Sequence, residues 1–189
     1  MEVNWEKFVE INSIGPKFQN VSLKMLKEDQ NETVCNFWLK NMKKSLVLSG
    51  DVGRGKSFFM YVLIKELLKK RHIYDVRFFR SKNLDDKLLA DIKEFGSNTY
   101  LLDQICQVPY LFIDDFGLER ASERVGREIY ELIDRRLELE KTTVLSSNLD
   151  EIGIKDLYGS KVHSRLQEYF WIKFTGKDLR KKGKHEVFR

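Results

Sequence analysis

Short, continuous runs of apolar residues alternate along this chain with longer segments in which apolar residues recur every three or four positions. Continuous runs of this length are typical of strands buried on both faces, whereas the longer spacing is typical of helices. We predict strands over residues 45–49, 75–79, 110–113, 142–146 and 169–174. We predict helices over residues 4–11, 33–43, 58–71, 84–95, 122–140, 151–157 and 160–168. This alternation predicts an α/β fold, in which a five-stranded parallel sheet carries helices on both faces.

Several side chains indicate the ends and the buried faces of these elements. Ser81 and Ser122 are N-cap candidates for the helices that follow them, and Gly96 ends the first of these two helices. In the second predicted helix, the spacing places four residues on the buried face: Val34, Phe37, Trp38 and Met42. In the second strand, Phe78 and Phe79 point to opposite sides of the sheet, so we expect at least one of them in the core.

The composition is that of a globular domain rather than a membrane or zinc-binding protein. Of the 189 residues, 42% are hydrophobic and 33% are charged, and no apolar run approaches the about 20 residues that a membrane span needs. The first residues include two acids and no basic-then-apolar signal, which favours a cytoplasmic protein with no membrane partner. Cys35 and Cys106 are far apart and the three histidines are scattered, so we expect buried thiols and no zinc site.

Positive charge is concentrated at the end of the chain. Residues 177–189 carry six lysines and arginines and two acids, which makes +4 of the +5 net charge of the whole chain. A basic tail favours a polyanionic partner, with nucleic acid first, and a solvated terminus is the alternative. We divide the chain into an N-terminal helical extension with the segment that leads into the core (1–43), a core domain (44–176) and a basic C-terminal tail (177–189).

One loop between a predicted strand and a predicted helix carries specific chemistry. It follows the pattern Gly50-x-x-x-x-Gly55-Lys56-Ser57, which is the phosphate-binding loop of nucleoside triphosphatases. The glycines let backbone N–H groups surround phosphate oxygens, the lysine neutralises the β- and γ-phosphates, and the serine hydroxyl binds Mg²⁺. The expected nucleotide contacts are Gly50, Asp51, Val52, Gly53, Arg54, Gly55, Lys56, Ser57 and Phe58. Because no residue of this loop recognises the base, GTP remains an alternative to ATP.

Polar side chains also lie near the ends of other strands, at the edge where parallel sheets bind ligands. Asp114 and Asp115 end the third strand, and we expect Asp114 to bind Mg²⁺ and Asp115 to orient the attacking water, with capping roles as the alternative. Asn148 follows the fourth strand, where it can contact the γ-phosphate or the water, or cap the next helix, as Asp150 also can. Arg165 precedes the fifth strand, where a guanidinium can stabilise a transferring phosphoryl group or lie in solvent.

Several motifs occur in a characteristic order: the phosphate loop, Ile-Asp-Asp-Phe-Gly, Leu-Ser-Ser-Asn-Leu, Ser-Arg-Leu and Phe-Thr-Gly-Lys-Asp-Leu-Arg. With these motifs the chain resembles the DnaC/DnaI helicase loaders and the related IstB transposition helpers, which are AAA+ ATPases of the initiator clade. The resemblance covers about residues 13–180. It implies an AAA+ P-loop NTPase core, and because the chain ends soon after the fifth strand we expect no C-terminal helical lid domain.

The resemblance also implies roles for individual residues. Asp114 and Asp115 match the Walker B pair, and Asn148 matches sensor 1. Arg165 matches the arginine finger, which acts on ATP held by a neighbouring subunit, and Arg180 matches the arginine of sensor 2. A finger that acts between subunits implies a homo-oligomer in the presence of ATP and DNA.

A protein that resembles this family is expected to hydrolyse ATP with Mg²⁺ and to act in DNA replication, binding single-stranded DNA and a replicative helicase. We expect the DNA contact over residues 77–82, where cationic and aromatic side chains interleave, so that phosphate neutralisation and base stacking combine. One departure is that only about a dozen residues precede the matching region, where typical loaders carry a helicase-binding domain. The alternatives are an IstB-like ATPase that assists a transposase, and a module that binds ATP as a switch with little hydrolysis.

Overall fold

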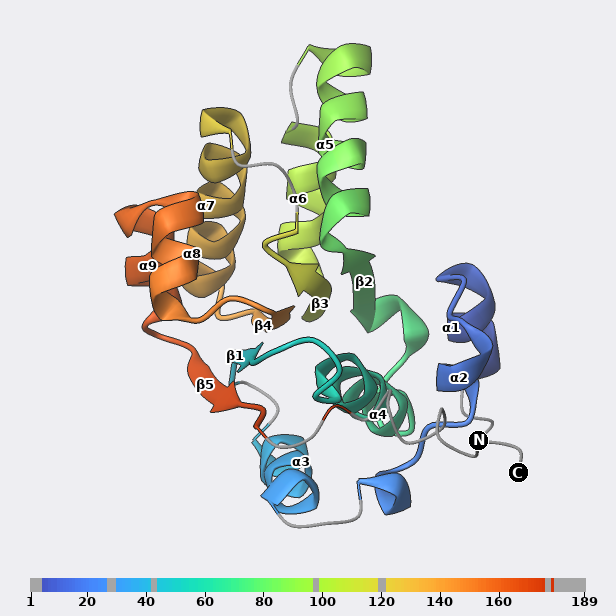
Figure 1. Ribbon diagram of the computed structural model, residues 1–189. Coiled ribbons are helices and arrows are strands. Elements are labelled where there is room, and N and C mark those ends of the chain that lie inside the picture. Colours follow the sequence, from blue (N-terminus) through green and yellow to red (C-terminus); the bar gives the residue numbers. More distant parts are fainter. Residues whose placement is uncertain are drawn as a thin grey trace, which may run out of the picture.

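A parallel sheet forms the centre of the molecule. The computed structural model of the 189-residue chain describes residues 5–26, 30–41, 44–96, 99–118, 122–175 and 178. In this part of the chain the strands are β1 (Leu46–Ser49), β2 (Val76–Arg80), β3 (Tyr110–Phe116), β4 (Thr142–Ser147) and β5 (Phe170–Lys173). They form one five-stranded sheet in the order β2-β3-β4-β1-β5, with every pairing parallel (Figure 1). The α/β fold and the parallel sheet predicted from the sequence are confirmed.

Helices connect the strands and cover both faces of the sheet. Those before β2 are α1 (Trp5–Ile11), α2 (Pro16–Gln19), α3 (Gln30–Lys40) and α4 (Lys56–Leu68), with short 3₁₀ turns at Leu23–Met25 and Ile73–Asp75. Those after β2 are α5 (Ser81–Phe95), α6 (Thr99–Gln107), α7 (Glu123–Glu138), α8 (Glu151–Tyr158) and α9 (Ser160–Leu166). Figure 1 shows α3 and α4 on one side of the sheet and α5 to α9 on the other. Among the described residues, no helix is long and apolar enough to cross a lipid bilayer.

Alternate residues of each strand contribute to two hydrophobic cores, one on each face. In β3, Phe112 packs into the core formed with α1, α3 and α4, whereas Leu111 and Ile113 pack into the core formed with α5 to α9. None of these three side chains is more than 1% exposed. Trp5 of α1 belongs to the first core, and its indole Nε1 donates a hydrogen bond of 2.6 Å to the backbone oxygen of Gln19. The apolar stretches of β1 and β3 are continuous because both faces of the sheet are buried there.

The buried face of α3 differs from the predicted one. The helix begins at Gln30 and ends at Lys40, and the buried side chains identified on it are Cys35, Trp38 and Leu39. Phe37 was expected on this face but is 57% exposed, and Met42 lies outside the described residues. The difference follows from the packing of Trp38, whose ring makes a T-shaped contact with the ring of Phe112 at a centroid distance of 6.3 Å. This contact turns the face of α3 that carries Trp38 toward the core.

Helix α6 was not predicted, although its sequence carries the signal. Leu102, Ile105 and Cys106 have helical spacing and are at most 2% exposed. The segment is short and lies between Gly96 and Pro109, and residues of these two types usually mark loops.

The predicted helix ends are mostly confirmed. Ser122 caps α7 by accepting a hydrogen bond of 3.2 Å from the backbone N–H of Val125. Gly96 ends α5 with a φ of 76°, which is a left-handed conformation that glycine adopts readily. Ser81 is the first helical residue of α5 rather than its N-cap, which is Arg80.

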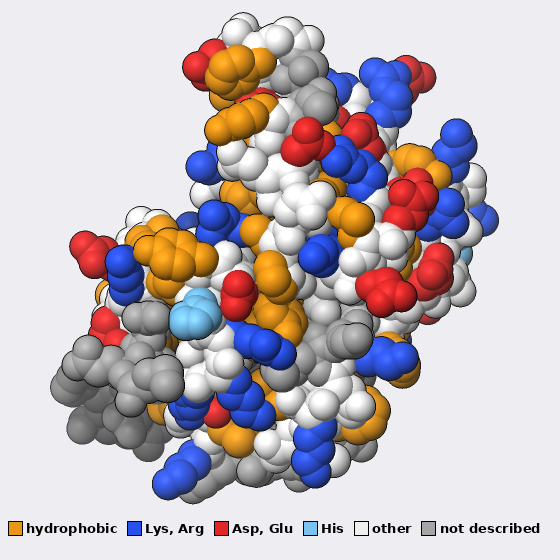
Figure 2. Space-filling model, turned by 180° about the vertical axis from the view of Figure 1, so that it is seen from behind, with side chains coloured by type: hydrophobic (Ala, Val, Ile, Leu, Met, Phe, Trp, Pro, Cys, Tyr) orange, Lys and Arg blue, Asp and Glu red, His pale blue; other side chains and the backbone are white. Residues whose placement is uncertain are grey.

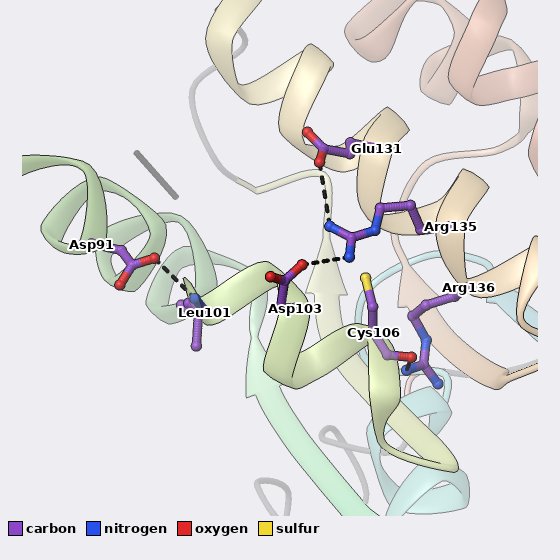
Figure 3. Close-up of polar contacts among 7 residues, drawn as sticks. All are labelled: Asp91, Leu101, Asp103, Cys106, Glu131, Arg135 and Arg136. Atoms are coloured by element: carbon purple, nitrogen blue, oxygen red, sulfur yellow. Dashed lines mark hydrogen bonds and ion pairs between the residues drawn. The ribbon is translucent and has the colours of Figure 1, made fainter. Parts of the chain in front are cut away.

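Polar contacts fasten α6 between α5 and α7 (Figure 3). Asp91 of α5 is 8% exposed and accepts a hydrogen bond of 2.9 Å from the backbone N–H of Leu101. Arg135 of α7 donates to Asp103 of α6 at 2.5 Å and to Glu131 of its own helix at 3.4 Å. Helices α5, α6 and α7 are therefore joined to one another.

Arg136 is a buried cation that joins α7 to α6 and β4. It is 0% exposed, and its guanidinium donates to five oxygens: Thr143 Oγ1 (2.8 Å) and the backbone oxygens of Thr142 (2.7 Å), Ile105 (2.5 Å), Cys106 (3.4 Å) and Val108 (3.0 Å). Burial lowers the pKa of Arg136 to about 10, which leaves the group charged at neutral pH. Carbonyls at the end of a helix have no intrahelical donors, so this cation satisfies the end of α6.

Candidate functional site

The loop between β1 and α4 has the backbone that the glycine pattern predicts. Gly50, Gly53 and Gly55 have φ values of 140°, 83° and 91°. A Cβ atom at Gly50 would collide with the backbone oxygen of Phe174, and one at Gly53 would collide with the carboxylate of Asp178. Glycine is therefore needed at Gly50 for both the backbone conformation and the close approach of the segment that follows β5, and at Gly53 for the backbone conformation, because the Asp178 carboxylate could move aside.

Lys56 lies at the centre of this loop and reaches the end of a second strand. Lys56 is only 6% exposed. Its Nζ donates to the backbone oxygens of Gly50 (2.5 Å) and Asp51 (2.9 Å). The same Nζ donates to Oδ1 of Asn148 at 2.8 Å, directly after β4. Asn148 is therefore at the loop, and the cap of α8 is Asp150, which accepts a hydrogen bond of 2.9 Å from the N–H of Gly153.

The other loop residues have varied surroundings. Val52 is 50% exposed, and Arg54 forms an ion pair of 3.2 Å with Asp51. Phe58, at the third position of α4, is half-buried against the core on the α3–α4 face. The structure thus brings the backbone of the loop and Lys56 to the sheet edge, whereas the Phe58 side chain faces the core.

Asp114 meets the phosphate loop through Ser57. The Oγ of Ser57 donates a hydrogen bond of 2.9 Å to Oδ1 of Asp114, and the hydroxyl of Ser146 donates to the same oxygen. Asp114 is 4% exposed, and burial raises the pKa of its carboxyl. The hydrogen bonds from Ser146 and Ser57 oppose this rise in the pKa of Asp114. The negative charge of Asp115 adds to the rise.

Asp115 has an unusual backbone conformation. Its φ is 59°, in the left-handed region that non-glycine residues enter at a cost of about 1–2 kcal/mol. Its backbone N–H donates a hydrogen bond of 3.0 Å to the Oγ of Ser146. Strain held in place by a buried hydrogen bond is common where a side chain must take a particular direction at a functional site.

Ser146 is a residue of this site that the sequence reasoning did not identify, and Ser147 follows it on β4 without a hydrogen bond to either acid. Both are 0% exposed. Ser147 donates a hydrogen bond of 2.7 Å to the backbone oxygen of Phe116 and accepts one of 3.0 Å from the N–H of Leu149. The only signal in the sequence is that two serines interrupt an apolar strand just before Asn148, and serines at the end of a strand are too common to indicate such contacts.

The side chains at the carboxyl ends of β1, β3 and β4 fit a magnesium ion bound together with phosphate. Ser57 and Asp114 present hard oxygen atoms within 2.9 Å of each other. In the described part of the chain no group of three or more histidines, cysteines or acids could hold a metal ion by itself. Mg²⁺ is usually held by one or two protein oxygens together with phosphate and water, and the oxygens of Ser57 and Asp114 fit that number.

Arg165 lies on a separate surface formed by α7 and α9. Its Nε donates to Asp134 of α7, and its guanidinium lies 5.9 Å from the ring centre of Tyr130. The contacts with Tyr130 and Asp134 raise the pKa of Arg165, and its side chain is 39% exposed. Both partners line a groove of about 1050 Å³ between α7 and the α8–α9 pair. Arg180 lies outside the described residues, as do the other cations of the tail.

The segment expected to bind DNA places its aromatic side chains in the two cores. Phe78 is 8% exposed, with ring centroids of Phe8 and Tyr61 at 6.2 and 5.5 Å, and Phe79 packs against the core on the opposite face. Phe78 is therefore in the core, as expected for at least one of the two rings, whereas Phe79 is half-buried and base stacking on it stays a prediction. The cations Arg77, Arg80 and Lys82 are exposed. On the face drawn in Figure 2, lysines and arginines are spread among acidic and hydrophobic side chains.

Comparisons with known proteins agree with the motifs. A model of the family described as IstB-like ATP binding protein matches residues 24–160. The replicative helicase loader DnaC of Buchnera aphidicola subsp. Baizongia pistaciae is 28% identical over 155 residues, which are 76% of this chain and 58% of that protein. An ATP-binding protein of insertion sequence IS1162 from Pseudomonas fluorescens is 29% identical over 112 residues, which are 59% of this chain and 46% of that protein. The chain thus spans about half the length of these relatives.

Solved structures show the same fold. A crystal structure of the DnaC helicase loader superposes with a TM-score of 0.74 at 21% identity, over 85% of this chain and all of that one. The replication initiator DnaA bound to AMPPCP and single-stranded DNA superposes with a TM-score of 0.72 at 18% identity, over 87% of this chain and 51% of that one. At these identities the likeness concerns the fold, which is the AAA+ P-loop type expected from the motifs. Because the family model covers well over half of the sequence and includes the phosphate loop and the ends of β3 and β4, the chain belongs to the family of IstB-like ATP binding proteins.

Proposed function

We propose that this protein is an ATP-dependent DNA-replication factor of the helicase-loader type, which hydrolyses ATP with Mg²⁺. The observation that carries the proposal is the pair of contacts that join the phosphate loop to two other strand ends. Lys56 bonds Asn148 at 2.8 Å and Ser57 bonds Asp114 at 2.9 Å. A loop that only held phosphate would not require an acid and an amide at the neighbouring strand ends, whereas hydrolysis requires groups that bind the metal and orient water.

Each group has a role that follows from its place. The N–H groups of residues 50–57 surround the phosphates, and Lys56 neutralises their charge. Ser57 and Asp114 hold Mg²⁺, which when bound neutralises charge on the β- and γ-phosphate oxygens. Asp115, half-buried beside Asp114, accepts a hydrogen bond from the attacking water, and Asn148 orients that water or the γ-phosphate.

Arg165 acts in a neighbouring subunit under this proposal. It is partly exposed on the α7–α9 surface, and the contacts identified for its side chain are with Tyr130 and Asp134 rather than with its own phosphate loop. A cation placed there is available to a second copy of the chain, where it stabilises charge on the transferring phosphoryl group. The proposal therefore includes a homo-oligomer in the presence of ATP and DNA, in which each active site uses residues of two subunits. Arg180 keeps its expected role in nucleotide binding as a prediction.

Single-stranded DNA and a replicative helicase are the proposed partners. The exposed cations Arg77, Arg80 and Lys82 support a DNA contact through phosphate neutralisation. The name of the DnaC relatives supports the helicase. The second candidate is an ATPase that assists a transposase, and it is favoured by the relative from insertion sequence IS1162.

Two measurements test the proposal. Hydrolysis of ATP is measured with and without single-stranded DNA in the wild type and in Asp115→Asn, and we expect wild-type turnover that the variant loses. Equal and negligible rates would instead identify an ATP-binding switch. Retention of the host's replicative helicase and of a transposase is then compared in the presence of ATP, and retention of the transposase alone would replace the first candidate by the second.

A further inference from the structure

Strand β3 leaves the regular ladder where it carries the two acids. Ile113 pairs with Leu145, and the next pair is Phe116 with Ser147. Between these pairs β3 advances three residues and β4 advances two, so β3 contains one extra residue, as in a β-bulge. A bulge removes regular backbone pairing, and other groups must then hold the backbone and aim its side chains.

The hydroxyl of Ser146 supplies hydrogen bonds at the bulge in β3. It accepts the hydrogen bond of 3.0 Å from the N–H of Asp115, and it donates its single proton to Oδ1 of Asp114. Because the residue is 0% exposed, water does not compete for either contact. One hydroxyl thus holds the left-handed backbone of Asp115 and the carboxylate of Asp114 at the same time.

Ser57 completes the arrangement from the other side. Its Oγ donates to the same Oδ1 of Asp114 at 2.9 Å. Two hydroxyls, one from the phosphate loop and one from β4, therefore set the orientation of a single carboxylate. Outer hydrogen bonds of this kind orient metal ligands, and their loss typically costs 10–100-fold in metal affinity or activity.

We propose that Ser146 is a positioning residue for magnesium-dependent ATP binding and hydrolysis, which acts by holding both acids of the bulge. The inference rests on the proposed function, because it assigns to Asp114 and Asp115 the roles given above. Ser146 touches neither nucleotide nor metal under this proposal, and its effect is transmitted through these two residues.

Ser147 is a matched control on the same strand. It is equally buried and makes the same number of identified hydrogen bonds, but to the backbone of Phe116 and Leu149 rather than to an acid. Loss of its hydroxyl removes two buried hydrogen bonds without touching either carboxylate. A merely structural role of Ser146 predicts that Ser146→Ala and Ser147→Ala behave alike.

The first experiment measures binding of a fluorescent, non-hydrolysable ATP analogue while MgCl₂ is titrated. We expect Ser146→Ala to raise the half-maximal Mg²⁺ concentration about tenfold, with unchanged affinity for the analogue in EDTA. Ser147→Ala should keep the wild-type midpoint, and Ser146→Thr, which keeps the hydroxyl, should restore it. Equal midpoints for the two alanine variants, or no rescue by threonine, would overturn the proposal.

The second experiment measures ATP hydrolysis at saturating Mg²⁺. For Ser146→Ala we expect kcat to fall on the order of 10–100-fold, while KM for ATP stays close to the wild-type value. A rise in KM with unchanged kcat would overturn the proposal. If the wild type itself hydrolyses no ATP, the proposed enzymatic function fails, and the magnesium titration still decides the role of Ser146.

Thermal unfolding shows whether the variants are folded. If Ser146→Ala does not fold, Ser146→Cys takes its place, because the thiol has a similar size and is a poor hydrogen-bond donor. The same tenfold rise in the Mg²⁺ midpoint is then expected for the cysteine variant, and a wild-type midpoint would overturn the proposal.

Discussion

Lys56 donates a hydrogen bond of 2.8 Å to Oδ1 of Asn148, which lies 92 residues further along the chain. This contact joins the phosphate loop after β1 to the residue directly after β4, the neighbouring strand in the sheet. The ammonium group also donates to the backbone oxygens of Gly50 and Asp51. The charge that the loop offers to phosphate is therefore held in place by the loop itself and by Asn148.

Asn148→Ala should affect turnover more than nucleotide affinity. The amide lies where it can orient the water or the γ-phosphate, and loss of one such group lowers kcat on the order of 100-fold. Lys56→Ala, by contrast, should weaken ATP binding at least about tenfold, or about 1.4 kcal/mol, because it removes the charge that faces the phosphates. Equilibrium binding and steady-state hydrolysis separate the two effects. Asn41→Ala, which removes an exposed amide on the far side of β1, serves as the control.

Arg165→Ala should abolish ATP hydrolysis, and mixing this variant with a second variant should restore part of the activity. A finger that acts between subunits contributes on the order of 10³-fold or more to the rate. Mixing Arg165→Ala subunits with Lys56→Ala subunits should recover part of the activity, because an intact phosphate loop can then face an intact arginine. Failure to recover any activity would show that Arg165 acts within its own subunit or not at all. Arg135→Ala, which removes another arginine paired with a carboxylate, should have little effect on the rate.

Asp114→Asn should stabilise the protein in the absence of nucleotide at neutral pH. Burial raises the pKa of Asp114 above its value in the unfolded chain, so the charged carboxylate destabilises the fold at every pH above that raised pKa. The penalty disappears as the pH falls below the ordinary range of an aspartate, because Asp114 is then protonated in both states. Asparagine keeps an oxygen for Ser57 and Ser146 and carries no charge.

Thermal unfolding midpoints at pH 7.5 and at acidic pH measure this difference. The advantage of Asp114→Asn over the wild type should be largest at pH 7.5 and should shrink in acid. Asp103→Asn is the control, because Asp103 is an exposed partner of Arg135 and should show no such gain. An advantage of Asp114→Asn that grew as the pH fell would contradict the assignment.

Arg136→Met should destabilise the fold by about 2–4 kcal/mol. The substitution has a similar length, but it leaves the carbonyls of Ile105, Val108 and Thr142 without their donor in a buried site. Chemical denaturation gives the free energy of unfolding. In Arg127→Met, which removes an exposed helical ion pair of 3.7 Å to Glu123, the loss should stay below about 0.5 kcal/mol. Equal losses in the two variants would contradict the role given to Arg136.

The double variant Arg77→Ala/Lys82→Ala should weaken single-stranded DNA binding at low salt. If each cation neutralises one phosphate, the slope of log affinity against log salt should fall by about 0.7 for each residue. Binding in a salt series tests this, with Lys69→Ala at the C-cap of α4 as the control cation. An unchanged slope would exclude this segment from the DNA contact and direct the search to the basic residues of 177–189.

Much of the site could be predicted because its parts are local in the sequence. The glycine pattern from Gly50 to Gly55 specifies a loop backbone, and the apolar run before Asp114 specifies a buried strand that ends at an acid. Parallel strands between helices then place both features at one edge of the sheet. Ser146 escaped prediction because its role depends on the extra residue in β3, and a bulge leaves no mark in an apolar run.

The sequence by itself determined the elements, the phosphate loop and the family, because periodicity and glycine positions act over a few neighbouring residues. Only the tertiary structure decided which polar groups meet: Lys56 with Asn148, Ser57 with Asp114, and Arg165 with Asp134. It also decided that Phe37 is exposed, and that Phe78 is the more deeply buried of the two phenylalanines of β2. The physical reason is that the order and register of the strands bring distant residues together, and no local pattern specifies either of them.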